Sequence, residues 1–152
     1  MGIITFPSSV EVTAIVDGIR GAIGRTADFY VIDHLDECTA CTLDPVTGGS
    51  TDSFCTVCSG LYYIPVYSGV TISGHVWWKV ADETLWPTGG KIYEGDATFQ
   101  LKYTLTNLNT VNNTEYLMLD GKTMTIRKKV VRGVPALNRI ILTLDEEERN
   151  NT

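Results

Sequence analysis

Two pairs of cysteines constrain this chain more than any other feature of its sequence. Cys38 and Cys41 form one C-x2-C pair, Cys55 and Cys58 form a second, and residues 42–54 separate them. In a C-x2-C turn both sulfurs point to the same side, so two such turns joined by a short loop can surround one ion. Four thiolates match the tetrahedral geometry and soft-ligand preference of Zn2+, and they leave no position for water or substrate. The sequence therefore predicts a structural zinc site.

Other uses of the cysteines stay open at this stage. The loop between the pairs is slightly shorter than the roughly 15–20 residues common in four-cysteine zinc sites. Two disulfides, reactive thiols and an iron centre are the alternatives. A redox C-x2-C normally begins a helix in a βαβ unit, and no such pattern surrounds these pairs. His34 is a potential competing ligand because it lies shortly before Cys38, but four thiolates suffice, so we expect it at the surface or at a strand end.

The overall composition indicates one globular domain over residues 1–152, because 43% of the residues are hydrophobic and 20% are charged. The formal net charge of −6 argues against nucleic-acid binding through clustered Lys and Arg. We expect no membrane span, since no apolar run approaches about 18 residues, and no secretory signal at the first residues. Clustered thiols without such a signal fit a reducing cytosol, where cysteines bind metal rather than oxidise.

Periodicity predicts one helix followed by strands. Apolar residues recur on one helical face over residues 9–23, with Ser8 or Ser9 as the N-cap. Gly18 and Gly21 weaken this helix, so we expect it to need a partner surface. Strands are predicted over the following ranges: 27–33, 62–66, 70–78, 97–105, 116–119, 122–131 and 137–144.

The connections complete the expected fold. Asp120-Gly121 is a typical hairpin turn, residues 107–113 read as a polar loop, and residues 146–152 read as a frayed acidic tail. The chain is therefore predicted to be mainly β, as a small antiparallel β-barrel or sandwich with an N-terminal helix. Residues 35–60 form the zinc-binding insertion between the first and second strands.

The sequence contains no strong candidate for a catalytic residue. His34 and His75 are the only histidines, and neither a nucleophile elbow nor a phosphate-binding glycine loop is present. Glu94 and Asp96 lie close together, but such a pair is more typical of a turn before a strand than of acid–base catalysis. The sequence therefore indicates a protein that is not an enzyme.

Two further groups have a structural and a functional interpretation. Trp77, Trp78 and Trp86 offer a binding platform, although packing in the core or at a barrel mouth is favoured. The basic residues 127–129 and Arg132 are interpreted as a solvated strand face, with contact to an acidic partner or DNA as the alternative.

Several segments together resemble small virion proteins of tailed bacteriophages. The resemblance covers residues 38–145. Its cysteine-pair signature lies at 38–41, 44–48, 54–60 and 63–65, a following block lies at 86–90 and 94–97, and the closing strands lie at 119–126 and 140–144. The closing strands resemble those of head-completion (stopper) proteins of the head–tail connector. The cysteine insertion departs from the plain stopper barrel.

This resemblance implies a subunit of a homo-oligomeric ring in the virion neck, made in the host cytoplasm. The ring would join the portal or an adaptor protein to tail terminator or tail tube proteins. DNA would pass through its lumen without specific binding, and an acidic lumen would repel the phosphates. The alternative is a zinc-ribbon module that contacts nucleic acid or another protein, although residues 35–60 contain no Lys or Arg. An enzyme built on a buried carboxylate pair is a third possibility.

Overall fold

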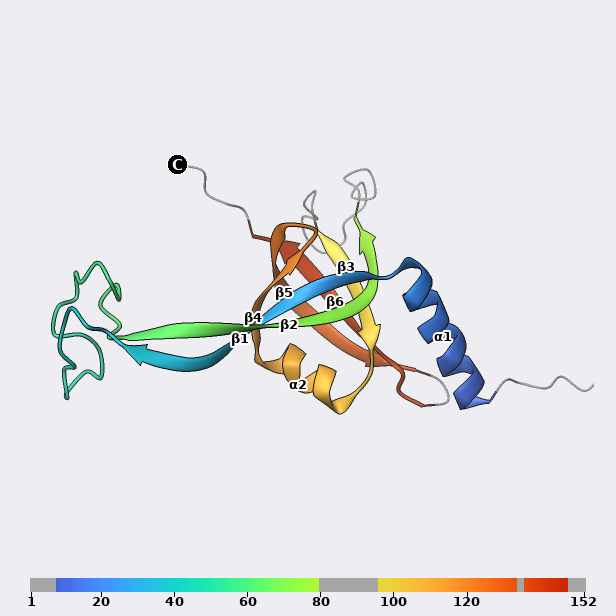
Figure 1. Ribbon diagram of the computed structural model, residues 1–152, viewed down its shortest axis with the longest axis horizontal. Coiled ribbons are helices and arrows are strands. Elements are labelled where there is room, and N and C mark those ends of the chain that lie inside the picture. The colour runs from blue at the N-terminus through green and yellow to red at the C-terminus, as the bar shows by residue number, and fades with distance from the viewer. Residues whose placement is uncertain (1–7, 80–95, 134–135, 148–152) are drawn as a thin grey trace, which may run out of the picture.

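The protein is a closed, six-stranded antiparallel barrel that carries an N-terminal helix and a long projecting arm (Figure 1). This computed structural model describes residues 8–79, 96–133 and 136–147. The strand order around the barrel is β1-β2-β3-β6-β5-β4, and β4 pairs with β1 to close it. The elements are α1 (Ser9–Ile23), β1 (Arg25–Glu37), β2 (Tyr63–Trp78), β3 (Ala97–Lys102), α2 (Leu105–Asn113), β4 (Thr114–Leu119), β5 (Lys122–Arg132) and β6 (Arg139–Glu146). Of the two predicted architectures, the barrel is confirmed.

The barrel core is built from alternate residues of each strand. Phe29 on β1 and Phe99 on β3 are both completely buried, with ring centroids 5.9 Å apart. The inward residues of β3 and β6 are the apolar members of an apolar–polar alternation: Ala97, Phe99, Leu101, Ile140, Leu142 and Leu144. Gly74 lets β2 cross this core closely, because a Cβ atom there would lie 2.5 Å from the Phe99 ring.

β1 and β2 extend well beyond the barrel and form the arm. β4 pairs with β1 only as far as Val31, and β3 pairs with β2 only from Gly74 onward. Farther out, residues 34–37 pair with residues 63–66 alone, and residues 38–62 lie at the end of this two-stranded ribbon (Figure 1). The prediction of two separate strands at 62–66 and 70–78 is wrong, because β2 is continuous. Pro65 is accommodated in the arm, where only β1 is paired with that part of β2.

α1 has the predicted bounds, and Ser8 is its N-cap. The Ser8 hydroxyl accepts from the Glu11 backbone, while the Glu11 carboxylate accepts from the Ser8 backbone, which forms a capping box. The contact of the helix with the barrel includes polar groups, however: the Arg20 side chain is buried and donates to the Asn138 carbonyl and to Asp17. Of the apolar stripe, Val12 and Val16 are half-buried, whereas Ile15, Ile19 and Ile23 are exposed.

The prediction of a polar loop at 107–113 is wrong, because this segment belongs to α2. The predicted strand at 97–105 ends earlier, at Lys102, and Thr104 caps the new helix by accepting from the Asn107 backbone at 3.0 Å. α2 buries Val111 against the barrel, and Leu108 packs beside it. Two apolar contacts among asparagines and threonines are too few to produce an amphipathic sequence pattern.

The remaining connections agree with the prediction in part. The β4–β5 hairpin turns at Asp120-Gly121, with φ values of 51° and 79°, as the sequence indicated. Glu146, predicted to begin a frayed tail, instead ends β6, and the Glu147 backbone donates to Thr123 at 3.0 Å. Trp86 and Glu94 lie outside the described residues.

Candidate metal centre

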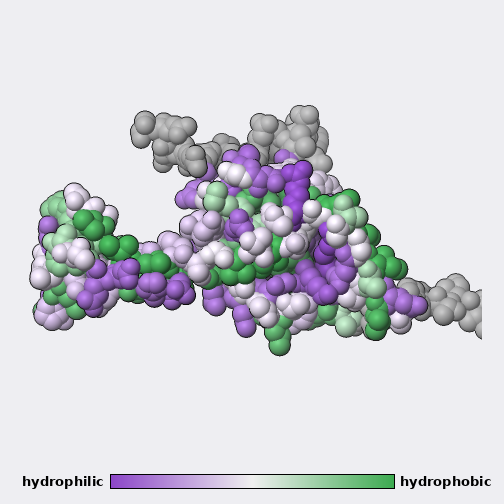
Figure 2. Space-filling model, in the orientation of Figure 1, coloured by the Kyte–Doolittle hydropathy of each residue, from purple (hydrophilic) through white to green (hydrophobic). Residues whose placement is uncertain are grey.

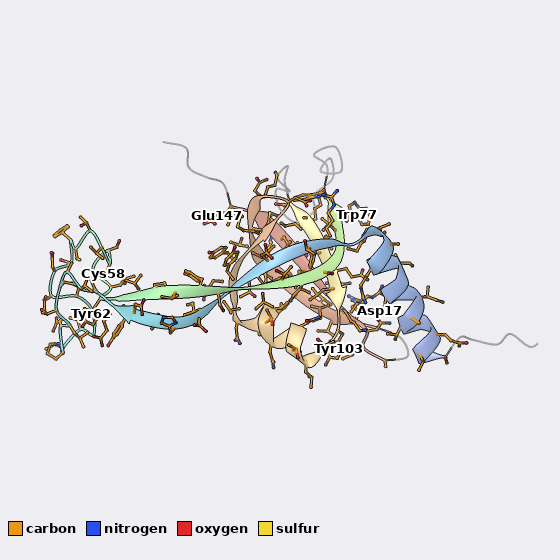
Figure 3. All side chains as sticks on the ribbon, in the orientation of Figure 1. Asp17, Cys58, Tyr62, Trp77, Tyr103 and Glu147 are labelled. Atoms are coloured by element: carbon orange, nitrogen blue, oxygen red, sulfur yellow. The ribbon has the colours of Figure 1, made fainter. Side chains whose placement is uncertain are left out.

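The four cysteines lie together in a compact unit at the tip of the arm, which we call the knuckle (residues 38–62). The strand ladder leads directly into it, since the Cys38 backbone donates to the Tyr62 carbonyl at 2.9 Å. Figure 3 shows Cys58 and Tyr62 at this end of the molecule. The knuckle thus has a fixed connection to both strands of the arm.

Tight turns after the second cysteine pair give the knuckle its shape. Ser59, Gly60 and Tyr62 have φ values of 50°, 81° and 68°. Gly60 is required by close packing as well, because a Cβ atom there would lie 2.8 Å from the Ser53 carbonyl oxygen. Left-handed conformations at non-glycine residues cost of the order of 1 kcal/mol each. The knuckle therefore needs a compensating interaction to hold these turns.

The loop between the cysteine pairs is a small hairpin ordered by its own side chains. The Asp44 carboxylate accepts from the Val46 backbone at 2.9 Å and from the Thr47 hydroxyl at 2.8 Å. Leu43 pairs with Ser50 in an isolated antiparallel bridge. These turn-forming residues thereby bring the second cysteine pair back to the first.

The sulfur atoms have the arrangement of ligands around one ion. All four Sγ atoms lie within 4.8 Å of one another, with 3.8 Å between Cys38 and Cys55 and 3.5 Å between Cys41 and Cys58. All four cysteines are free, and these separations far exceed the roughly 2.05 Å of a disulfide. Three of the side chains are buried and Cys41 is half-buried. The knuckle can therefore hold a metal ion.

Proton affinities in the cluster show how strongly the thiols influence one another. For Cys41, a hydrogen bond with Ser50 lowers the pKa, but burial and the three neighbouring thiols outweigh it and raise the pKa to about 12. For Cys58, burial opposes ionisation, yet a hydrogen bond from the Tyr62 backbone and the other three thiols lower the pKa to about 6. A bound cation stabilises all four sulfurs as thiolates, because its charge offsets their mutual repulsion.

His34 is an exposed residue of the arm and does not belong to the four-residue metal-binding group. Its Nδ1 lies 2.9 Å from the Asp33 carboxylate and its Nε2 lies 3.3 Å from that of Asp36. The hydrogen bond with Asp33, aided by Asp36, raises the pKa of the imidazole above its usual value. The surface placement expected from the sequence is confirmed.

The other sequence candidates do not converge on one site. Trp77 is 63% exposed, so the packing expectation is wrong for this residue, whereas Trp78 is half-buried with the Lys122 ammonium 5.7 Å from its ring. Asp96 is buried beside β2, and its carbonyl accepts from the Lys79 backbone. The basic residues of β5 are all exposed, as expected for a solvated strand face.

Sequence reasoning missed a charged cluster where α1 meets the barrel. The Asp17 carboxylate receives Arg20 at 2.7 Å and Lys102 at 2.6 Å. The hydrogen bond from Lys102, together with Arg20, lowers the pKa of Asp17. The available signal was that Asp17 and Arg20 lie three residues apart, so that their side chains meet on the surface of α1.

Comparison with protein-family models, with curated proteins and with solved structures finds no match to this chain. Among the described residues, neither helix has the length and hydropathy that crossing a membrane requires.

Proposed function

We propose that the ion held by the knuckle is Zn2+ and that its role is structural. A tetrahedron with Zn–S bonds of about 2.3 Å has S–S edges of about 3.8 Å. The Sγ–Sγ separations of 3.8 Å between Cys38 and Cys55 and of 3.5 Å between Cys41 and Cys58 are close to this value. With four thiolate ligands the ion has no open position for a substrate, so its contribution is to order the knuckle and its strained turns.

The arm is proposed to be an element for binding other proteins. A two-stranded ribbon is at best marginally stable in water. A metal ion bound at its tip would make the ribbon stiff. The closed four-sulfur site at the tip is therefore the observation that carries the proposal. The knuckle also presents apolar side chains to solvent: Val46 is 90% exposed and Phe54 is 89% exposed. Exposed apolar groups at the end of a stiff arm favour contact with a partner.

We further propose that the chain is a structural virion protein of a tailed phage neck, where it forms a homo-oligomeric ring between the portal or head and the tail. The support is the resemblance of the segments within residues 38–65 to small virion proteins of tailed bacteriophages and that of the closing strands within residues 119–144 to stopper proteins, together with a barrel that carries a projecting arm. No catalytic step is part of this role. Partners are neighbouring copies, the portal or adaptor protein, and tail terminator or tail tube proteins, while DNA passes through the lumen unbound.

The alternative function is a zinc-ribbon module that contacts nucleic acid or another protein. Residues 26–78, which include the whole arm, contain no Lys or Arg but do contain Asp33, Asp36 and Glu37 in the ribbon and Asp44 and Asp52 in the knuckle. Contact with phosphates requires cations, so this charge distribution favours a protein partner over nucleic acid.

The proposal is tested by measuring assembly and metal content together. The purified chain is expected to contain about one zinc per chain, to form rings visible by electron microscopy and mass photometry, and to leave labelled double-stranded DNA unshifted. Cys55→Ser is expected to lose the metal and the rings, while Thr56→Ser in the same turn retains both. Rings that persist after complete chelation would mean that assembly does not depend on the metal-stiffened arm. DNA binding through the knuckle would favour the zinc-ribbon module.

A further inference from the structure

Charge is divided unequally between the two ends of the molecule. Residues 26–78 contain no Lys or Arg, so all 12 cationic residues of the chain lie outside this segment. On the ribbon, Asp33 and Asp36 are 60% and 62% exposed, and Glu37 is exposed beside them. The arm therefore presents carboxylates without any cationic side chain of its own apart from the titratable His34.

The opposite end of the barrel carries a row of cations. Lys102 on β3, Arg139 on β6 and Arg132 on β5 are direct register partners, so their side chains leave the barrel on the same face. α1 lies against this row, because its Asp17 binds Lys102 and its Arg20 donates to the Asn138 carbonyl. Figure 3 shows Asp17 at the end of the molecule remote from Cys58.

This cationic row is incompletely neutralised. Like charges placed directly opposite each other across a sheet destabilise it, so the row needs carboxylates nearby. Among the described residues, Asp17 is the carboxylate in contact with Lys102 of the row and with Arg20. Lys102 and Arg132 are exposed, so the excess of positive charge in this row is accessible to additional carboxylates.

Each end of the molecule also carries exposed apolar side chains (Figure 2). On α1, Ile15, Ile19 and Ile23 are 60%, 52% and 57% exposed. At the far end, Val46 and Phe54 project from the knuckle. The two ends thus match each other in apolar character and are opposite in charge.

We infer that the arm of one copy docks on the α1 end of the next copy. The ribbon carboxylates face the row of Lys102, Arg139 and Arg132, and the apolar tip of the knuckle packs on the isoleucine stripe of α1. The contact uses two different surfaces, so it repeats head to tail and closes into a ring when the rotation between copies permits. This inference rests on the proposed ring function and identifies the contact that builds the ring.

A second copy fits these surfaces better than nucleic acid does. Phosphates would satisfy the cationic row, but they would leave both the isoleucine stripe and the knuckle tip in water. A second arm brings carboxylates and apolar groups together, attached to one stiff element. Opposite charge also steers the two surfaces together, so the contact weakens as salt is added.

Reversal of single charges tests the contact. Arg132→Glu and Asp36→Lys each place like charges across the proposed interface, and each is expected to weaken self-association at least about tenfold in sedimentation velocity at low salt. The matched controls are Lys128→Glu, on the same strand but outside the row, and Glu115→Lys, an exposed acid outside the arm; both are expected to associate as the native chain does.

Restoration separates this contact from general charge effects. The double variant Asp36→Lys/Arg132→Glu is expected to regain association, and so is a mixture of the two single variants, because each junction again pairs opposite charges. Rings that are indifferent to both reversals, or a double variant no better than the singles, would overturn the contact and leave the ring proposal intact. A native chain that stays monomeric up to about 1 mM would overturn both. Loss of nucleic-acid binding in Arg132→Glu, with unchanged self-association, would reassign the row to nucleic acid.

Discussion

Loss of the metal is predicted to loosen the knuckle and the arm without unfolding the barrel. Cys55→Ser removes one of four ligands and leaves a weaker hydroxyl in its place. The three remaining cysteines and the half-buried side chains of Tyr62 and Ile64 then form the whole packed interior of the knuckle. This group is separate from the barrel core, so its loss removes no contact from that core.

The magnitude follows from the chain length that the metal closes. The ion ties Cys38 to Cys58 across residues 38–58, and the chain-entropy relation for a cross-link of this length gives about 3 kcal/mol. That free energy holds the left-handed turns at Ser59 and Tyr62 in place, and without it we expect the knuckle to sample many conformations. The barrel depends on none of these residues, so its free energy of unfolding should change by less than about 1 kcal/mol and its Tm by a few degrees.

Hydrogen exchange measured by mass spectrometry resolves the two parts. In Cys55→Ser, protection should be lost over the knuckle and the ribbon residues 34–37 and 63–66, while β3 and β6 keep native protection. Thr56→Ser is the matched control and should retain one metal per chain and native exchange. Loss of protection in β3 and β6 together with the knuckle would contradict this prediction, and so would a variant that keeps both its metal and its protected knuckle.

Three further predictions address the barrel, the second helix and the arm. Gly74→Ala should destabilise the protein by about 1–3 kcal/mol in denaturant unfolding, because the new methyl group would overlap the Phe99 ring. Thr104→Ala should cost about 1 kcal/mol through loss of the α2 cap, with locally faster amide exchange in that helix. An NMR titration should give His34 a pKa above 6.5, and this pKa should fall in Asp33→Asn. Because the folded-state pKa is raised, the stabilising contribution of His34 is complete below about pH 6.5 and is lost as pH rises through the raised pKa.

The features that sequence predicted best are those determined by neighbouring residues. The bounds of α1 follow from the Ser8 capping box and a sustained helical period, and the β4–β5 hairpin follows from Asp120-Gly121. The convergence of the four cysteines belongs to the same class, since spacing within each C-x2-C turn already directs its two sulfurs to one side. In these cases the determining interactions span only a few residues, so the sequence pattern contains them.

The features that sequence missed depend on distant contacts. α2 is helical because Val111 reaches the barrel core, a contact that its polar sequence does not reveal. β2 runs continuously through Ser68 and Gly69 because its partner β1 continues opposite them. The apolar stripe of α1 was correctly located, but periodicity does not specify which side of a helix contacts the barrel, and here that side contains Asp17 and Arg20.

The separation of the two buried groups gives the proposed metal a role that the barrel core does not fill. The barrel has a continuous apolar interior centred on Phe29 and Phe99, so its folding needs no ion. The knuckle has no comparable interior, and the ribbon that joins it to the barrel is paired through one ladder only. In the proposed zinc-bound form, the ion therefore determines the position and stiffness of the arm rather than the existence of the fold. An arm with no binding role would need no such clamp. An arm that docks on the apolar and cationic surface of a neighbouring copy, as inferred above, gains affinity if it is rigid before binding, because less conformational freedom is then lost.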